Sequence, residues 1–147
     1  MKQYPVVLAA LELNAESDRR VLDTVKMLHA QGSEVFLIHA VEHTSSYGLA
    51  YGVSAGVDVE SILMEEAKDM MKKVGESLKV PVSHRLVLLG PAKFVILDEA
   101  ARLDVNLIVV GSHGRHGVRL LLGSTANAIL HGAKCDVLAV RLPNELT

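Results

Sequence analysis

A glycine-rich stretch that follows an apolar run has the residue types and spacing of an anion-binding loop. The apolar run 107–110 is followed, in chain order, by Gly111, Gly114, Arg115 and Gly117. Glycines let a backbone turn sharply and bring its N–H groups close to a ligand. Further on, Ser124 or Thr125 can cap a helix whose first N–H groups favour an anion. The stretch predicts a strand, a glycine loop and a helix start that bind an anion together; a loop that only turns tightly is the alternative.

The elements that must position this loop alternate along the chain. Continuous apolar runs predict buried parallel strands at 5–11, 35–41, 82–89, 106–110 and 137–140. Between them, apolar residues recur every three or four positions and predict helices with buried stripes within 21–28, 59–78, 92–103 and 126–133. These stripes include Ile62, Met70 and Leu130. Five strands alternating with four helices predict an α/β fold with a single open, doubly wound parallel sheet.

The predicted topology brings distant residues to one place. In an open parallel sheet, ligands bind beyond the carboxyl ends of the strands, where the strand order reverses. The residues that should converge there are Leu11, Glu12, Ala40, Val41 and the loop that begins at Gly111. Small apolar groups such as Ala10 and Ala40 suit a flat base, the carboxylate of Glu12 suits ribose hydroxyls, and the loop suits phosphates. This set describes a nucleotide, although Glu12 taken alone is equally consistent with a solvated carboxylate.

Composition and charge exclude several other classes of function. The 147 residues are half apolar, which is enough for a core in one domain spanning residues 1–147. A net charge of −2 with few aromatic residues leaves no pattern for nucleic acid. The apolar runs are shorter than the roughly 18 residues that cross a bilayer, so no membrane insertion is predicted. Cys135 is the only cysteine and no signal peptide pattern fits, so a cytoplasmic protein without a disulfide is expected.

The histidines do not predict catalysis or a metal site. His113 and His116 lack a third ligand nearby in the sequence, and no Gly-Lys-Ser/Thr ending follows the glycine loop. His39 lies within an apolar strand, which favours a hydrogen-bonded core histidine over a ligand. The segment 42–56 contains three glycines and little apolar pattern, and a lid and a plain linker are equally consistent with it.

The segments 107–115 and 122–126 resemble the universal stress protein family, and the resemblance extends over the whole chain. It includes the acidic residue after the first strand, the segment 37–42, the helix start at 90–92 and the end at 135–141. The resemblance implies a five-stranded parallel sheet of order 3-2-1-4-5 and a role in stress responses. It also implies a homodimer through the last strand, residues Val137, Leu138, Ala139 and Val140. An edge strand paired with its own copy would satisfy its free N–H and C=O groups.

One branch of this family binds ATP through a signature of Gly, two residues, Gly, nine residues, Gly and Ser or Thr. The matching residues are Gly111, Gly114, Gly123 and Ser124. The resemblance assigns phosphate contacts to Gly114, Gly123, Ser124 and Thr125. It places His113 and Arg115 beside the phosphates, and Ala40 and Gly111 near the base or ribose.

Two departures from this signature bear on the function. Eight residues, 115–122, separate the second and third glycines, and Glu12 stands where the family commonly has Asp. The resemblance implies a regulatory protein that binds ATP, with or without Mg, and hydrolyses it very slowly or not at all. The alternative is a family member without nucleotide that works as a dimeric protein-interaction module. A regulated protein partner is compatible with both.

Overall fold

The computed structural model describes residues 4–42, 58–112 and 123–141. Its strands are β1 (Val6–Ala10), β2 (Glu34–Val41), β3 (Arg85–Leu89), β4 (Leu107–Ser112) and β5 (Asp136–Arg141). All neighbouring pairs are parallel, and the sheet order is β3-β2-β1-β4-β5. This confirms both the doubly wound parallel sheet predicted from the apolar runs and the strand order implied by the resemblance.

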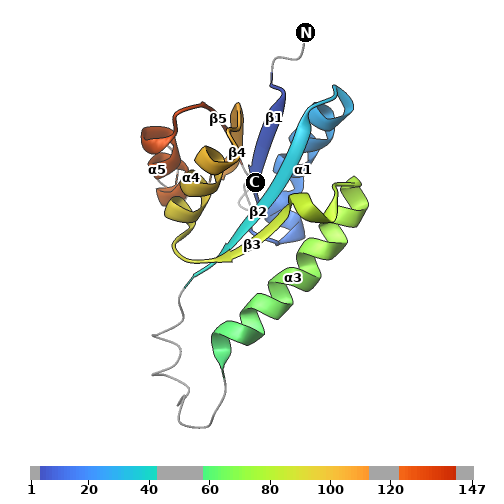
Figure 1. Ribbon diagram of the computed structural model, residues 1–147, viewed down its shortest axis with the longest axis vertical. Coiled ribbons are helices and arrows are strands. Elements are labelled where there is room, and N and C mark those ends of the chain that lie inside the picture. The colour runs from blue at the N-terminus through green and yellow to red at the C-terminus, as the bar shows by residue number, and fades with distance from the viewer. Residues whose placement is uncertain (1–3, 43–57, 113–122, 142–147) are drawn as a thin grey trace, which may run out of the picture.

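Helices cover both faces of the sheet (Figure 1). They are α1 (Ala15–Ala30), α3 (Val59–Leu78), α4 (Ala92–Arg102) and α5 (Ser124–Gly132). The helices α1 and α3 lie on one face, and α4 and α5 lie on the other. Side chains of β1 alternate between two cores, because Val7 and Ala9 pack under α1 and α3 whereas Leu8 packs under α4 and α5. All three are fully buried, as expected of a central strand that reads as a continuous apolar run.

The third strand is shorter than the predicted segment 82–89. Residues Val82–His84 form a single 3-10 turn, η2, in which the His84 amide donates to the Pro81 carbonyl at 2.9 Å. Pairing with β2 begins only at Arg85, opposite Leu37. The apolar run predicted the start of the strand too early, because Val82 is 76% exposed and lies before the paired region.

The predicted helix stripes were too wide. Ile62 and Met70 of α3 are 49% and 47% exposed, and Leu130 of α5 is 41% exposed, so assigning them to the core was wrong. The buried residues of α3 follow one narrow line, Ala67, Met71, Gly75 and Leu78. Ile62 and Met70 lie off that line and face water, whereas Val74, next to Gly75, is still partly buried against the core. No helix in the described ranges is long and apolar enough to cross a membrane.

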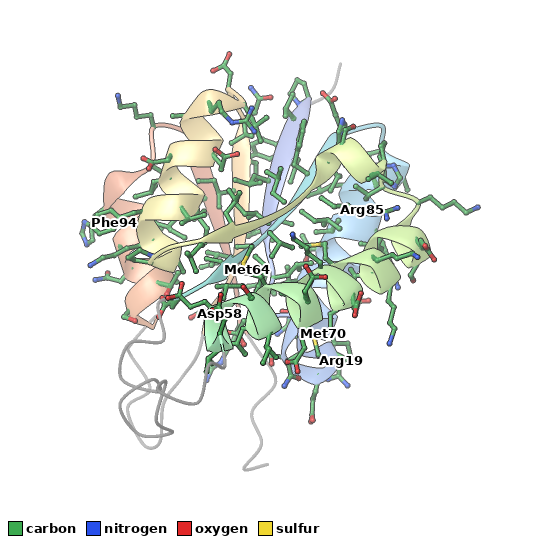
Figure 2. All side chains as sticks on the ribbon, turned by 60° about the horizontal axis from the view of Figure 1, so that its bottom comes forward. Arg19, Asp58, Met64, Met70, Arg85 and Phe94 are labelled. Carbon is green, nitrogen blue, oxygen red and sulfur yellow. The ribbon has the colours of Figure 1, made fainter. Side chains whose placement is uncertain are left out.

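The end of α3 is joined to the start of β3 by a buried glycine and an arginine. The Arg85 side chain, labelled in Figure 2, lies against Gly75, and a Cβ atom at this glycine would overlap it. Its Nε and Nη2 atoms donate to the Val80 carbonyl at 3.0 and 2.8 Å. A cation at the end of a helix also interacts favourably with the helix dipole. The small residue therefore lets the guanidinium hold α3 against the edge of the sheet.

The turn from β1 to α1 is held by a buried carboxylate. The Asp18 side chain accepts hydrogen bonds from the Glu12 amide at 2.9 Å and from the Leu13 amide at 2.8 Å. Leu13 has a φ of 61°, a left-handed conformation that is costly for a residue with a side chain. Asp18 is only 3% exposed. It therefore satisfies two backbone amides that neither the strand nor the helix can pair.

Burial of this carboxylate raises the pKa of Asp18 above its ordinary value. The cost of removing the charged form from water is the largest cause, and the negative charge of Glu12 acts in the same direction. The hydrogen bonds from the Glu12 and Leu13 amides oppose the shift without cancelling it.

We predict that Asp18→Asn destabilises the protein at neutral pH. The amide has one acceptor oxygen where the carboxylate has two, so one backbone amide of the turn loses its partner, at a cost of about 1–3 kcal/mol in the free energy of unfolding. Urea denaturation measures this loss. Asp23→Asn is the matched control, because Asp23 is exposed on the same helix; a change of about 0.5 kcal/mol or less is expected for it. Equal effects of the two substitutions would contradict the role of Asp18.

The destabilisation caused by Asp18→Asn is also predicted to depend on pH. Because the pKa of Asp18 is higher in the folded state, its protonated form adds stability beyond that which the ionised form provides at neutral pH. This added stability is lost as pH rises through the raised value and is fully present below the ordinary value of 3.8. The difference in unfolding free energy between wild type and Asp18→Asn should therefore widen as pH falls toward that value. Urea denaturation at several acidic pH values measures it, and a difference that narrows on acidification would contradict the assignment.

Candidate functional site

The predicted site residues of the first, second and fourth strands lie together at the carboxyl edge of the sheet. The strands β1 and β2 are paired up to Ala10 and Ile38, and β1 and β4 are paired up to Ala9 and Val109. The residues just past these pairs are Leu11, Glu12, Ala40 and Gly111. Figure 2 turns the bottom of Figure 1, where these strands end, toward the viewer. The convergence predicted from the topology is thus observed for these residues.

This edge combines a small apolar surface with the exposed carboxylate of Glu12. Ala10, Ala40 and Gly111 are half-buried, and Leu11 is 4% exposed. The Glu12 side chain is exposed, while its backbone amide is bound to Asp18. Small side chains leave room for a flat group against the backbone, and a carboxylate at the rim accepts hydrogen bonds from hydroxyls.

His39 makes a hydrogen bond at the same edge. Its Nδ1 atom lies 2.8 Å from the Leu11 carbonyl oxygen, and the ring is half-buried. The Leu11 amide in turn donates to the Ile38 carbonyl at 2.8 Å. A carbonyl can only accept, so Nδ1 carries the proton in this bond. The prediction of a hydrogen-bonded histidine in the strand is confirmed.

The N-terminus of α5 also faces this edge. Since β4 and β5 are parallel, the helix between them must run back from the carboxyl edge to the amino edge. Its N-cap is Gly123, with a φ of 90°, and no side chain of the described residues caps it. The prediction that Ser124 or Thr125 caps the helix was wrong, because both lie inside its first turn. Glycine suits the position because a positive φ is strained for other residues.

The other helices of the described ranges have side-chain acceptors at their N-termini. The Asn14 side chain accepts from the Glu16 and Ser17 amides of α1, and the Asp58 side chain accepts from the Ser61 amide of α3. For α4, Glu42 Oε1 at the end of β2 accepts from the Ala92 amide at 3.3 Å. Neither Pro91 at the start of α4 nor Gly123 at the start of α5 caps its helix with its own side chain. Within the described residues, α5 alone has no side-chain acceptor at its start. A helix N-terminus with free N–H groups is suited to an anion.

Part of the predicted site lies outside the described residues. His113, Gly114 and Arg115 fall in the segment 113–122, so their phosphate contacts remain predictions. The same holds for His116 and for the choice between a lid and a plain linker in the segment 42–56, of which the structure describes only Glu42. Within the described residues, no three His, Cys, Asp or Glu side chains gather as a metal site would require.

Burial raises the pKa of the Cys135 thiol, which disfavours the reactive thiolate there.

Two residues at this edge were missed by the sequence analysis, namely Asp18 and Glu42. For Asp18 an indication existed, because its spacing of three and seven residues from Val21 and Val25 places a carboxylate on the buried face of α1. Glu42 gave no such indication, since its partner Ala92 is 50 residues away in the chain.

Comparison with known proteins agrees with this architecture. The model of the universal stress protein family matches residues 3–141. Universal stress protein A homolog 2 of Coxiella burnetii is 57% identical over 143 residues, which cover 97% of this chain and 98% of that protein.

Two solved structures share the fold at lower identity. A hypothetical protein studied as a test case of structural genomics superposes with a TM-score of 0.76 at 23% identity, over 97% of this chain and 99% of that chain. A universal stress protein in complex with cAMP superposes with a TM-score of 0.58 at 22% identity, over 93% of this chain and 96% of that chain. With the family match over nearly the full length, the chain belongs to the universal stress protein family.

Proposed function

We propose that this protein binds ATP at the carboxyl edge of its sheet and acts as a regulatory, dimeric protein. The observation that carries the proposal is the N-terminus of α5, which has no side-chain cap from the part of the chain that the structure describes and faces the edge that holds Gly111 and Glu12. The universal stress protein solved with cAMP is a precedent for an adenine nucleotide on this fold.

Each part of ATP has a matching group in this proposal. The base lies on the surface formed by the half-buried Ala10, Ala40 and Gly111 together with the buried Leu11. The ribose hydroxyls meet the exposed carboxylate of Glu12. The phosphates, with or without Mg, lie before the first turn of α5 at Gly123, Ser124 and Thr125, where N–H groups and the helix dipole favour negative charge. The predicted phosphate contacts of His113, Gly114 and Arg115 belong to the same proposal.

The proposal is for binding, with hydrolysis very slow or absent. The sequence has no Gly-Lys-Ser/Thr ending after the glycine loop. The alternative is a nucleotide-free dimeric interaction module, which the eight-residue spacing before Gly123 and the Glu12 substitution favour. Calorimetric titration with ATP separates the two functions.

We predict that the wild type binds ATP and that Ser124→Glu weakens this binding about tenfold or more. A carboxylate in the first turn of α5 repels the phosphates by about 1–3 kcal/mol. The same carboxylate stabilises the helix, because it complements the dipole at the N-terminus. Ser124 is exposed, so the substitution does not disturb the core. Titration calorimetry measures the affinity, and thermal unfolding checks that the variant is folded.

His131→Glu is the matched control for this experiment. It adds a carboxylate at an exposed position in the last turn of the same helix. We expect its ATP affinity to stay within about twofold of wild type. Equal loss of affinity in both variants would contradict a phosphate site at the N-terminus of α5. Absence of binding to the wild type would favour the interaction module.

The dimer in this proposal forms through β5. This strand ends the sheet order and pairs with β4 alone within the described sheet, so its outer side has N–H and C=O groups available to a partner strand. Leu138, on this strand, is 41% exposed. Pairing with a second copy across a two-fold axis would satisfy these N–H and C=O groups and bury Leu138.

We predict that Leu138→Asp converts a dimer into a monomer. A charge on the outer strand of each copy would be buried against its equivalent, which is strongly unfavourable. Light scattering should give twice the chain mass of 15.8 kDa for the wild type and the single mass for the variant. Met27→Asp, at a 53% exposed position on α1, should remain dimeric. A wild-type protein with the mass of one chain at micromolar concentration would rule the dimer out.

A further inference from the structure

We infer that His39 is a positioning residue of the nucleotide site, which holds the backbone at Leu11 so that the Glu12 carboxylate meets the ribose hydroxyls. The inference rests on the proposed ATP binding and deepens it, because it assigns a role to a side chain that does not itself contact the ligand. It starts from the hydrogen bond of 2.8 Å between His39 Nδ1 and the Leu11 carbonyl.

Leu11 is tied to β2 through both of its backbone polar groups. Its amide donates to the Ile38 carbonyl at 2.8 Å, and its carbonyl accepts from the His39 ring. The parallel pairing of β1 with β2 stops at Ala10, opposite Ile38. The His39 side chain thus holds the chain where regular pairing between the two strands ends.

The next two residues are held by α1. The Glu12 and Leu13 amides donate to the buried Asp18 carboxylate of α1. Of the three consecutive residues 11–13, the first is therefore bound by β2 and the other two are bound by α1, with Glu12 in the middle. The φ of 61° at Leu13 is a conformation that a side-chain-bearing residue keeps only when its surroundings hold it there. A backbone held in this way fixes the direction in which the exposed Glu12 side chain leaves the turn.

The chemistry of the bond defines informative substitutions. Because the Leu11 carbonyl only accepts, the required group is an N–H donor at the Nδ1 position. His39→Asn can place an amide N–H near that position, whereas His39→Leu removes the donor and keeps an apolar side chain. His39→Asn should therefore keep the hydrogen bond to the Leu11 carbonyl that His39→Leu loses.

A second histidine, which also binds a backbone carbonyl through its Nδ1 atom, provides a matched control. His84 Nδ1 lies 3.1 Å from the Val35 carbonyl, at the amino end of β2, and the ring stacks on Phe36 with centroids 4.0 Å apart. Its Nε2 lies 3.4 Å from a Glu34 carboxylate oxygen. His84→Leu therefore removes the same kind of bond at the opposite edge of the sheet from Glu12.

The test compares ATP with 2′,3′-dideoxy-ATP by titration calorimetry. The wild type should prefer ATP, and His39→Leu should reduce this preference about fivefold, because one well-placed hydrogen bond is worth about that factor. His39→Asn and His84→Leu should keep the wild-type preference. A role of His39 in stability alone would weaken both nucleotides equally and leave the preference unchanged, which would overturn the inference. A wild type that binds both nucleotides equally would overturn it as well.

A measurement without ligand separates this inference from the proposed function. In the nucleotide-free protein, amide hydrogen exchange at Glu12 and Leu13 should be faster in His39→Leu than in wild type, by about threefold or more, and unchanged in His84→Leu. Unchanged exchange in His39→Leu would overturn the positioning role even if ATP binds. Faster exchange in a protein that fails to bind ATP would keep the backbone role of His39 and reject the nucleotide.

Discussion

The fold depends on β1, which is hydrogen-bonded on both sides and buried on both faces. It pairs with β2 and β4, and its side chains alternate between the core under α1 and α3 and the core under α4 and α5. A central parallel strand has no face for polar side chains, which explains its run of valine, leucine and alanine. The reversal of strand order on either side of β1 also creates the edge at which a ligand can bind.

A central strand that ends at such an edge leaves backbone groups without ladder partners. The turn after β1 resolves this with side chains, because Asp18 accepts from two of its amides and His39 binds the Leu11 carbonyl. Each of these side chains comes from an element packed against β1. The conformation of the turn, including the positive φ at Leu13, is therefore a product of the packed fold.

The four helix N-termini differ in whether a side chain of this chain accepts hydrogen bonds from their first amides. Those of α1, α3 and α4 are paired with side chains of this chain, and the carboxylate of Glu42 at α4 comes from the end of β2. The N-terminus of α5 begins at a glycine and has no such partner within the described residues. A helix start without a side-chain partner is the kind of place that suits an anion.

The sequence by itself determined the strands, the alternation with helices and the edge at which the site residues meet, because continuous apolar runs and glycine spacing are local properties. The strand order came from a family resemblance, since no local pattern says which strands are neighbours. Only the tertiary structure decided that Gly123 caps α5, that Glu42 pairs with Ala92 and that His39 binds Leu11. The last two contacts join residues 50 and 28 positions apart, and such contacts exist only once the sheet has brought their strands and helices together.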